Sequence, residues 1–155
     1  MQLFLHLLKR LLLVVVGYFV SVAVGLVAVL ILYTALSSLP GAPDYFAAMS
    51  TSPLVVIAVP PVALFIYLLT IVLTGAQTLV AAVMAELFEL RSIFVHALFG
   101  LLAAVTGFFM AWPTLLDGFE GSDWADLGIV AAAGLAAGIC YWLIAGRGAG
   151  IRPRP

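Results

Sequence analysis

Charge interrupts the middle of this apolar chain at one short stretch, ELFELRSIFVH, residues 86–96. Two carboxylates, one guanidinium and one imidazole lie in it, contributed by Glu86, Glu89, Arg91 and His96. Outward from it, residues 45–85 and 92–116 carry no charge at all. We therefore expect a short polar connection between two apolar segments, and any chemistry on this side of the protein to lie in or near it.

The composition is that of a membrane protein. Of 155 residues, 66% are hydrophobic and 8% are charged, whereas soluble proteins average about 25% charged residues. Charge-free runs cover residues 11–43, 45–85, 92–116 and 127–146, and about 20 apolar residues are enough to cross a hydrocarbon core of about 30 Å. The sequence predicts an all-α integral membrane four-helix bundle, a single domain over residues 1–155 with spans at about 11–36, 62–85, 93–113 and 125–145.

The basic residues predict the orientation. All six fall on what becomes one side of four spans: Lys9, Arg10, Arg91, Arg147, Arg152 and Arg154. By the positive-inside rule, both termini and the middle loop are cytoplasmic. The single cysteine, Cys140, excludes an internal disulfide and a Cys-x-x-Cys redox pair.

Two further features of the helices follow from the pattern. Residues 1–10 place apolar and polar groups on different faces, which predicts a short interfacial lead-in helix running into the first span. The roughly 30 residues that follow Pro53 would make a helix of about 45 Å, longer than a bilayer needs. We expect Pro60 and Pro61 to kink or restart that helix.

Small residues recur at helical spacing on three of the four spans. Such faces let helices approach closely in lipid, where there is no hydrophobic drive between them. The expected helix-packing residues are Gly17, Ser21, Gly25, Gly100, Gly107, Gly134 and Gly138.

Polar residues mark one face of the second span. These residues are Thr70, Thr74, Gln77 and Thr78. An unpaired amide in hydrocarbon costs several kcal/mol, so Gln77 needs a hydrogen-bond partner. One interpretation is that the threonines bond their own helix and Gln77 joins two helices. The other is a polar path, with Glu86 and His96 at its inner mouth or acting as a proton relay.

Other kinds of site have little support in the sequence. His6 and His96 are the two histidines, too few for a protein metal site without further ligands; a haem iron held between them is the alternative. Asp117 and Asp123 do not have the rigid setting of an aspartyl protease. We expect no catalytic residue, metal, cofactor or nucleic-acid surface.

Residues 85–92, AELFELRS, and 141–150, YWLIAGRGAG, resemble small four-span inner-membrane proteins of alphaproteobacteria. The resemblance implies a bacterial inner membrane. It brings no activity, so no functional residue is carried over. The chain differs from small multidrug exporters by lacking a buried carboxylate in its first span, and it lacks the Asn and Phe motifs of fluoride channels.

Three functions remain at this point. The leading hypothesis is a non-enzymatic protein that works by helix association, as an accessory or scaffolding subunit or a homo-oligomer, with membrane lipids and membrane protein as its partners. The alternative is a small oligomeric transporter or channel that uses the polar face of residues 70–78. A lipid-modifying or proteolytic enzyme is the third.

Overall fold

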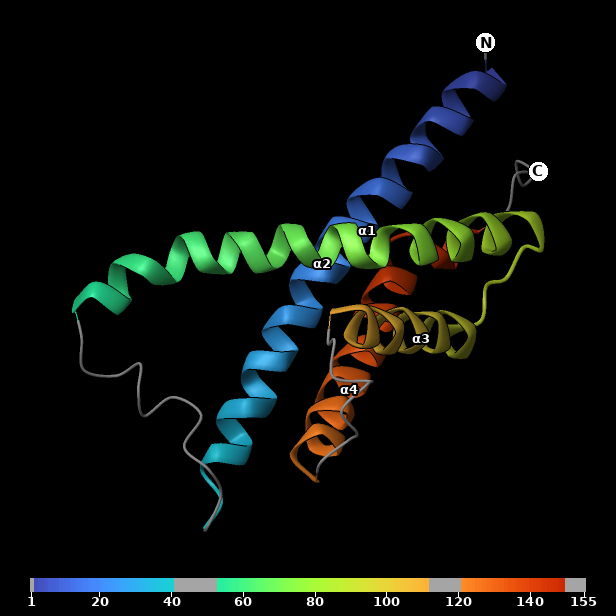
Figure 1. Ribbon diagram of the computed structural model, residues 1–155. Coiled ribbons are helices and arrows are strands. Elements are labelled where there is room, and N and C mark those ends of the chain that lie inside the picture. The colour runs from blue at the N-terminus through green and yellow to red at the C-terminus, as the bar shows by residue number, and fades with distance from the viewer. Residues whose placement is uncertain (1, 41–52, 112–120, 150–155) are drawn as a thin grey trace.

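The computed structural model describes residues 2–40, 53–111 and 121–149. Its elements are α1 (Gln2–Ser37), α2 (Pro53–Leu87), α3 (Ile93–Ala111), α4 (Gly121–Ile144) and a short 3-10 helix, η2 (Gly146–Gly148) (Figure 1). All regular structure in these ranges is helical, as the composition predicts. The acidic loop residues Asp44 and Asp117 lie outside the described residues.

Each of the four α-helices contains a segment long and apolar enough to cross a membrane. These segments are Leu8–Ser37, Val59–Leu87, Ile93–Met110 and Trp124–Ile144. Their number agrees with the number of spans that the charge-free runs predict. The described residues therefore contain four helices suited to a multi-pass membrane protein.

The two long helices are continuous. The expected lead-in helix is not a separate element, because α1 runs from Gln2 to Ser37 without a break. Likewise, α2 does not restart at Pro60 and Pro61 but passes through both. At about 1.5 Å per residue, each helix is more than about 50 Å long, well beyond the hydrocarbon thickness.

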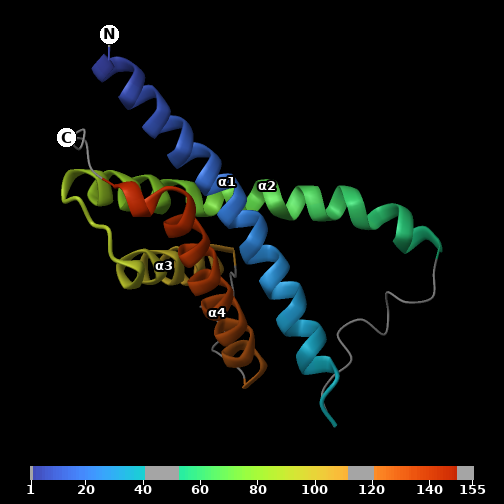
Figure 2. The same cartoon turned by 180° about the vertical axis from the view of Figure 1, so that it is seen from behind.

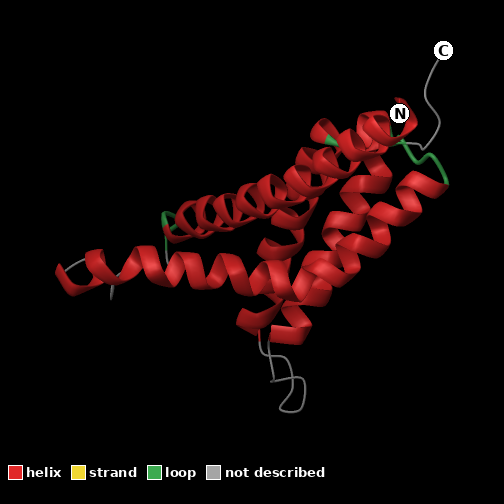
Figure 3. Ribbon diagram, turned by 90° about the horizontal axis from the view of Figure 1, so that it is seen from above, coloured by secondary structure: helices red, strands yellow, loops and turns green. Residues whose placement is uncertain are grey.

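The most extensive helix contact joins α3 and α4, followed by α1 with α4 and α2 with α3. The contact between α1 and α2 is the smallest of these. Figures 1 and 2 show α2 crossing α1, with the first part of α2 extending away from the other helices. The view from above in Figure 3 shows the same extension.

Glycine lets α3 and α4 approach at backbone distance. A Cβ added to Gly134 would lie 2.6 Å from the Cβ of Ala104, and one added to Gly100 would lie 2.7 Å from the Cα of Gly138. Side chains at these positions would force the helices apart. The GxxxG pair thus faces a helix of its own chain.

The remaining small residues also lie at contacts within the chain. A Cβ on Gly17 would be 3.4 Å from the Cβ of Ala145, and one on Gly25 would be 3.3 Å from that of Ala137, both in the last third of the chain. Ser21, between them on α1, is buried. Gly107 of α3 approaches Thr74 of α2 instead, because a Cβ added to Gly107 would lie 3.2 Å from the threonine Cγ2.

Candidate functional site

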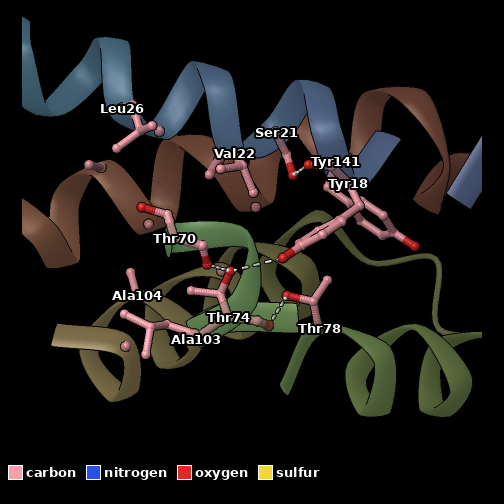
Figure 4. A pocket seen from close by; sticks show the side chains of 18 of the residues that line it. Tyr18, Ser21, Val22, Leu26, Thr70, Thr74, Thr78, Ala103, Ala104 and Tyr141 are labelled. Atoms are coloured by element: carbon pink, nitrogen blue, oxygen red, sulfur yellow. Dashed lines mark hydrogen bonds between the residues drawn. The ribbon is translucent and has the colours of Figure 1, made fainter. Parts of the chain in front are cut away.

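A cavity of about 350 Å³ lies between the four helices, and each helix contributes to its lining. Figure 4 shows Val22 and Leu26 of α1 across the cavity from Ala103 and Ala104 of α3. Along α1 the lining runs from Tyr18 to Val29, a rise of about 16 Å at 1.5 Å per residue. The cavity thus follows the helices through the middle of the apolar segments.

Five of the hydroxyl groups at this cavity bond to helix carbonyls. Thr70, Thr74 and Thr78 each donate at 2.8 Å to the carbonyl oxygen four residues earlier. The Tyr18 hydroxyl donates to the carbonyl of Ile71 at 2.8 Å and lies 3.1 Å from the Thr74 hydroxyl oxygen. Ser21 donates to the carbonyl of Tyr18. All five hydroxyl groups therefore donate hydrogen bonds within the chain. With its three threonines bonded in this way, the polar face of α2 is much less polar than its sequence implies.

Gln77 does not belong to this lining. Its Nε2 lies 3.4 Å from the sulfur of Met110 on α3, a weak acceptor. Its Oε1 is buried and has no hydrogen-bond partner among the described residues. Gln77 therefore joins α2 to α3 but does not extend the row of threonines into a path.

A group of charged and aromatic side chains lies where α1 begins, α2 ends, α3 begins and α4 ends. Arg10 forms an ion pair with Glu86, and its Nη1 donates to the carbonyl of Ala145 at 3.3 Å. Both paired side chains are largely buried, with 13% and 22% of their surface exposed. One guanidinium thereby connects α1, α2 and the end of α4.

The turn between α2 and α3 is fixed to the segment after α4. Arg91 donates from Nε to the carbonyl of Ala149 at 2.8 Å and lies 3.3 Å from Glu89. Trp142 donates from Nε1 to the carbonyl of Arg91 at 2.7 Å, and the guanidinium of Arg147 lies 4.9 Å from its ring centroid. Arg10, Arg91 and Arg147, distant in sequence, are thus brought to one end of the protein.

His96 lies beside this group and is buried, with 2% of its surface exposed. Its Nδ1 is 2.9 Å from the carbonyl oxygen of Ser92, and its ring stacks on Tyr141 with centroids 5.8 Å apart. Because a carbonyl only accepts, the Nδ1 N–H of His96 donates to Ser92. Nε2 points toward Gly146 and has no hydrogen-bond partner among the described residues.

Within the described ranges, no three His, Cys, Asp or Glu side chains come together as metal ligands would. The side chains of His6 and Asp123, and the whole of Asp117, fall outside the described parts. The haem and aspartyl protease alternatives, which depend on these residues, therefore stay untested.

Two residues of this region escaped the sequence analysis. Tyr18 was not singled out, although it lies three residues before Ser21, on the same face of a helix. Arg10 was assigned only a topological role, because nothing in the sequence connects it to Glu86.

No family model, curated protein or solved structure matches this chain. What can be said of its class comes from the helices themselves: four long apolar helices suggest a multi-pass membrane protein.

Proposed function

We propose that this is a non-catalytic multi-pass protein of the bacterial inner membrane that works by associating with membrane-embedded helices. Its role is that of an accessory or scaffolding subunit, or of a homo-oligomer. The observation that carries the proposal is a long apolar face of α2 that the other described residues leave uncovered.

That face is a continuous stripe. Only 6% of the most apolar window of Val59–Leu87 is buried. Phe65, Val72 and Leu79 recur every seven residues with 65%, 74% and 65% of their surface exposed, and Leu68 and Val83 are exposed between and after them. Residues at this spacing lie along one side of a helix, as the seam of a left-handed helix pair does.

The stripe is a better surface for association than the glycine faces. Gly134 and Gly138 contact α3 and Gly17 contacts the end of α4, so these small residues already have helix neighbours. In lipid, two helices associate through van der Waals packing. A helix of a second chain lying along α2 supplies that packing where its own chain does not.

The charge distribution supports the orientation that we propose. Arg10, Arg91 and Arg147 gather at one end of the helices through their contacts with Glu86, Ala149 and Trp142. By the positive-inside rule this end is cytoplasmic, and both chain termini lie on that side.

Photo-crosslinking in native membranes tests the association. Val72 is replaced by p-benzoylphenylalanine, and the matched control carries the same group at Val27, which is 55% exposed on α1. We expect position 72 to give a discrete crosslinked product, twice the chain mass for a homo-oligomer or a defined larger mass for another subunit. Lipid adducts alone at position 72, with no protein product, would contradict the proposal.

Conduction along α2 has less support, because the hydroxyls of Thr70, Thr74 and Thr78 are bonded to their own helix. Proteoliposome flux separates the two functions. The association proposal expects no flux above that of empty liposomes from the parent protein. A flux that Gln77→Leu changes without altering assembly would favour the transporter.

A further inference from the structure

We propose that the cavity between the four helices binds one acyl chain of a membrane phospholipid. The proposal concerns the interior of the protein, so it is independent of what covers the outer stripe of α2.

The size of the cavity is that of a binding site. Protein interiors are close-packed and contain few voids larger than a water molecule, whereas ligand pockets measure about 300–1,000 Å³. The cavity, at about 350 Å³, belongs to the second group. Its extent of about 16 Å along α1 is also close to half of the hydrocarbon thickness of about 30 Å, the depth that one leaflet's acyl chains occupy.

The chemistry of the lining favours hydrocarbon over water or a polar solute. The lining hydroxyls of Tyr18, Thr70 and Thr74 donate to carbonyls of the chain. The Nδ1 N–H of His96 donates to the carbonyl of Ser92, and its Nε2 lies against Gly146 at the start of η2. Cavities with a mainly apolar lining stay dry and take up apolar ligands.

The cavity reaches the surface between α1 and α2. Ile66 and Leu69 of α2 belong to its lining, yet 46% and 41% of their surface is exposed. The two helices have the smallest helix contact noted above, and Tyr67 bonds to the carbonyl of Phe19 where they meet. An acyl chain from the surrounding bilayer would enter laterally at these exposed lining residues of α2.

The test uses the full-length protein in nanodiscs that contain phosphatidylglycerol with a photoactivatable diazirine near the end of one acyl chain. After illumination, the labelled residues are mapped by mass spectrometry. We expect labelling of residues that line the cavity, such as Val22 and Ala103, in addition to the outer surface. Labelling confined to outward-facing residues such as Val27 and Val72 would overturn the proposal.

A filled cavity provides the second arm. Ala103→Leu adds three carbons to the lining, and we expect at least a fivefold loss of labelling inside the cavity with outer labelling unchanged. Ala132→Leu, the same change at an exposed position of α4 outside the lining, is expected to label as the parent does. Undiminished cavity labelling in a folded Ala103→Leu variant would count against binding there, and if that variant does not fold, the map of the parent protein decides.

Discussion

Arg10 and Glu86 are 76 residues apart in the sequence and form an ion pair that joins the early part of α1 to the end of α2. The same guanidinium donates to the carbonyl of Ala145 beyond the end of α4. This pair of charges thereby connects the early part of α1 to the ends of α2 and α4. Because the pair is largely buried, its two members depend on one another.

We expect a double-mutant cycle to reveal this dependence. Arg10→Met and Glu86→Gln each leave one partner without its counterpart, and each is expected to lower the free energy of unfolding by about 3 kcal/mol, in the range measured for buried pairs. The double variant is expected to lose less than the sum of the two, since the interaction between the two side chains is lost only once. Unfolding in mixed micelles measures the three values, and strict additivity would contradict the coupling.

The α3–α4 contact gives a second prediction. Gly138→Ala places a Cβ within 2.9 Å of the Cα of Ala97, and overpacking of this kind costs about 1–3 kcal/mol. Gly128→Ala is the matched control on the same helix, because no neighbouring atom lies within 4 Å of its added Cβ. We expect a lower melting temperature only for Gly138→Ala. Equal melting temperatures for the two variants would show that the close approach of α3 and α4 at Gly138 does not contribute to stability.

Gln77 provides a substitution expected to stabilise the protein. Its Oε1 is buried without a hydrogen-bond partner among the described residues, and an unsatisfied polar atom costs about 1–3 kcal/mol. Gln77→Met keeps the length of the side chain and removes that atom. We expect a gain of about 1 kcal/mol in thermal or denaturant unfolding. A clear loss of stability would contradict this prediction, because it would mean that the interactions of the Gln77 amide stabilise the protein by more than its buried oxygen destabilises it.

Trp142 ties the end of α4 to the turn between α2 and α3 through its bond to the carbonyl of Arg91. Trp142→Phe keeps an aromatic ring but removes the N–H donor, at an expected cost of about 1 kcal/mol. We expect faster amide hydrogen exchange in residues 88–92. Phe94→Leu, at an aromatic residue that is 82% exposed, serves as the control and is expected to leave that exchange unchanged.

The contacts of Gly134 and Gly138 with α3 determine where association can be tested. Isoleucine at Gly134 or Gly138 is a poor test of association, because both residues contact α3 of the same chain. Such variants disturb the folded chain before they disturb any assembly. A probe on the exposed α2 stripe, at Val72, reports on association alone.

The sequence by itself determined that there are four long apolar helices, because about 20 residues without charge are needed to cross hydrocarbon and four runs meet that length. It also determined where the small-residue faces lie. It could not assign those faces to partners: in lipid, buried and outward-facing side chains are both apolar, so periodicity carries little information about which side faces in.

Only the tertiary structure decided which groups meet. It paired Arg10 with Glu86, placed Tyr18 against Thr74 and opened a cavity among four helices. Each of these depends on how separate helices cross, and helix crossing is set by the side-chain packing of all the elements together rather than by any local pattern. The physical reason is that a helix in lipid satisfies its own backbone hydrogen bonds wherever it lies. Its sequence therefore does not specify which other helices pack against it.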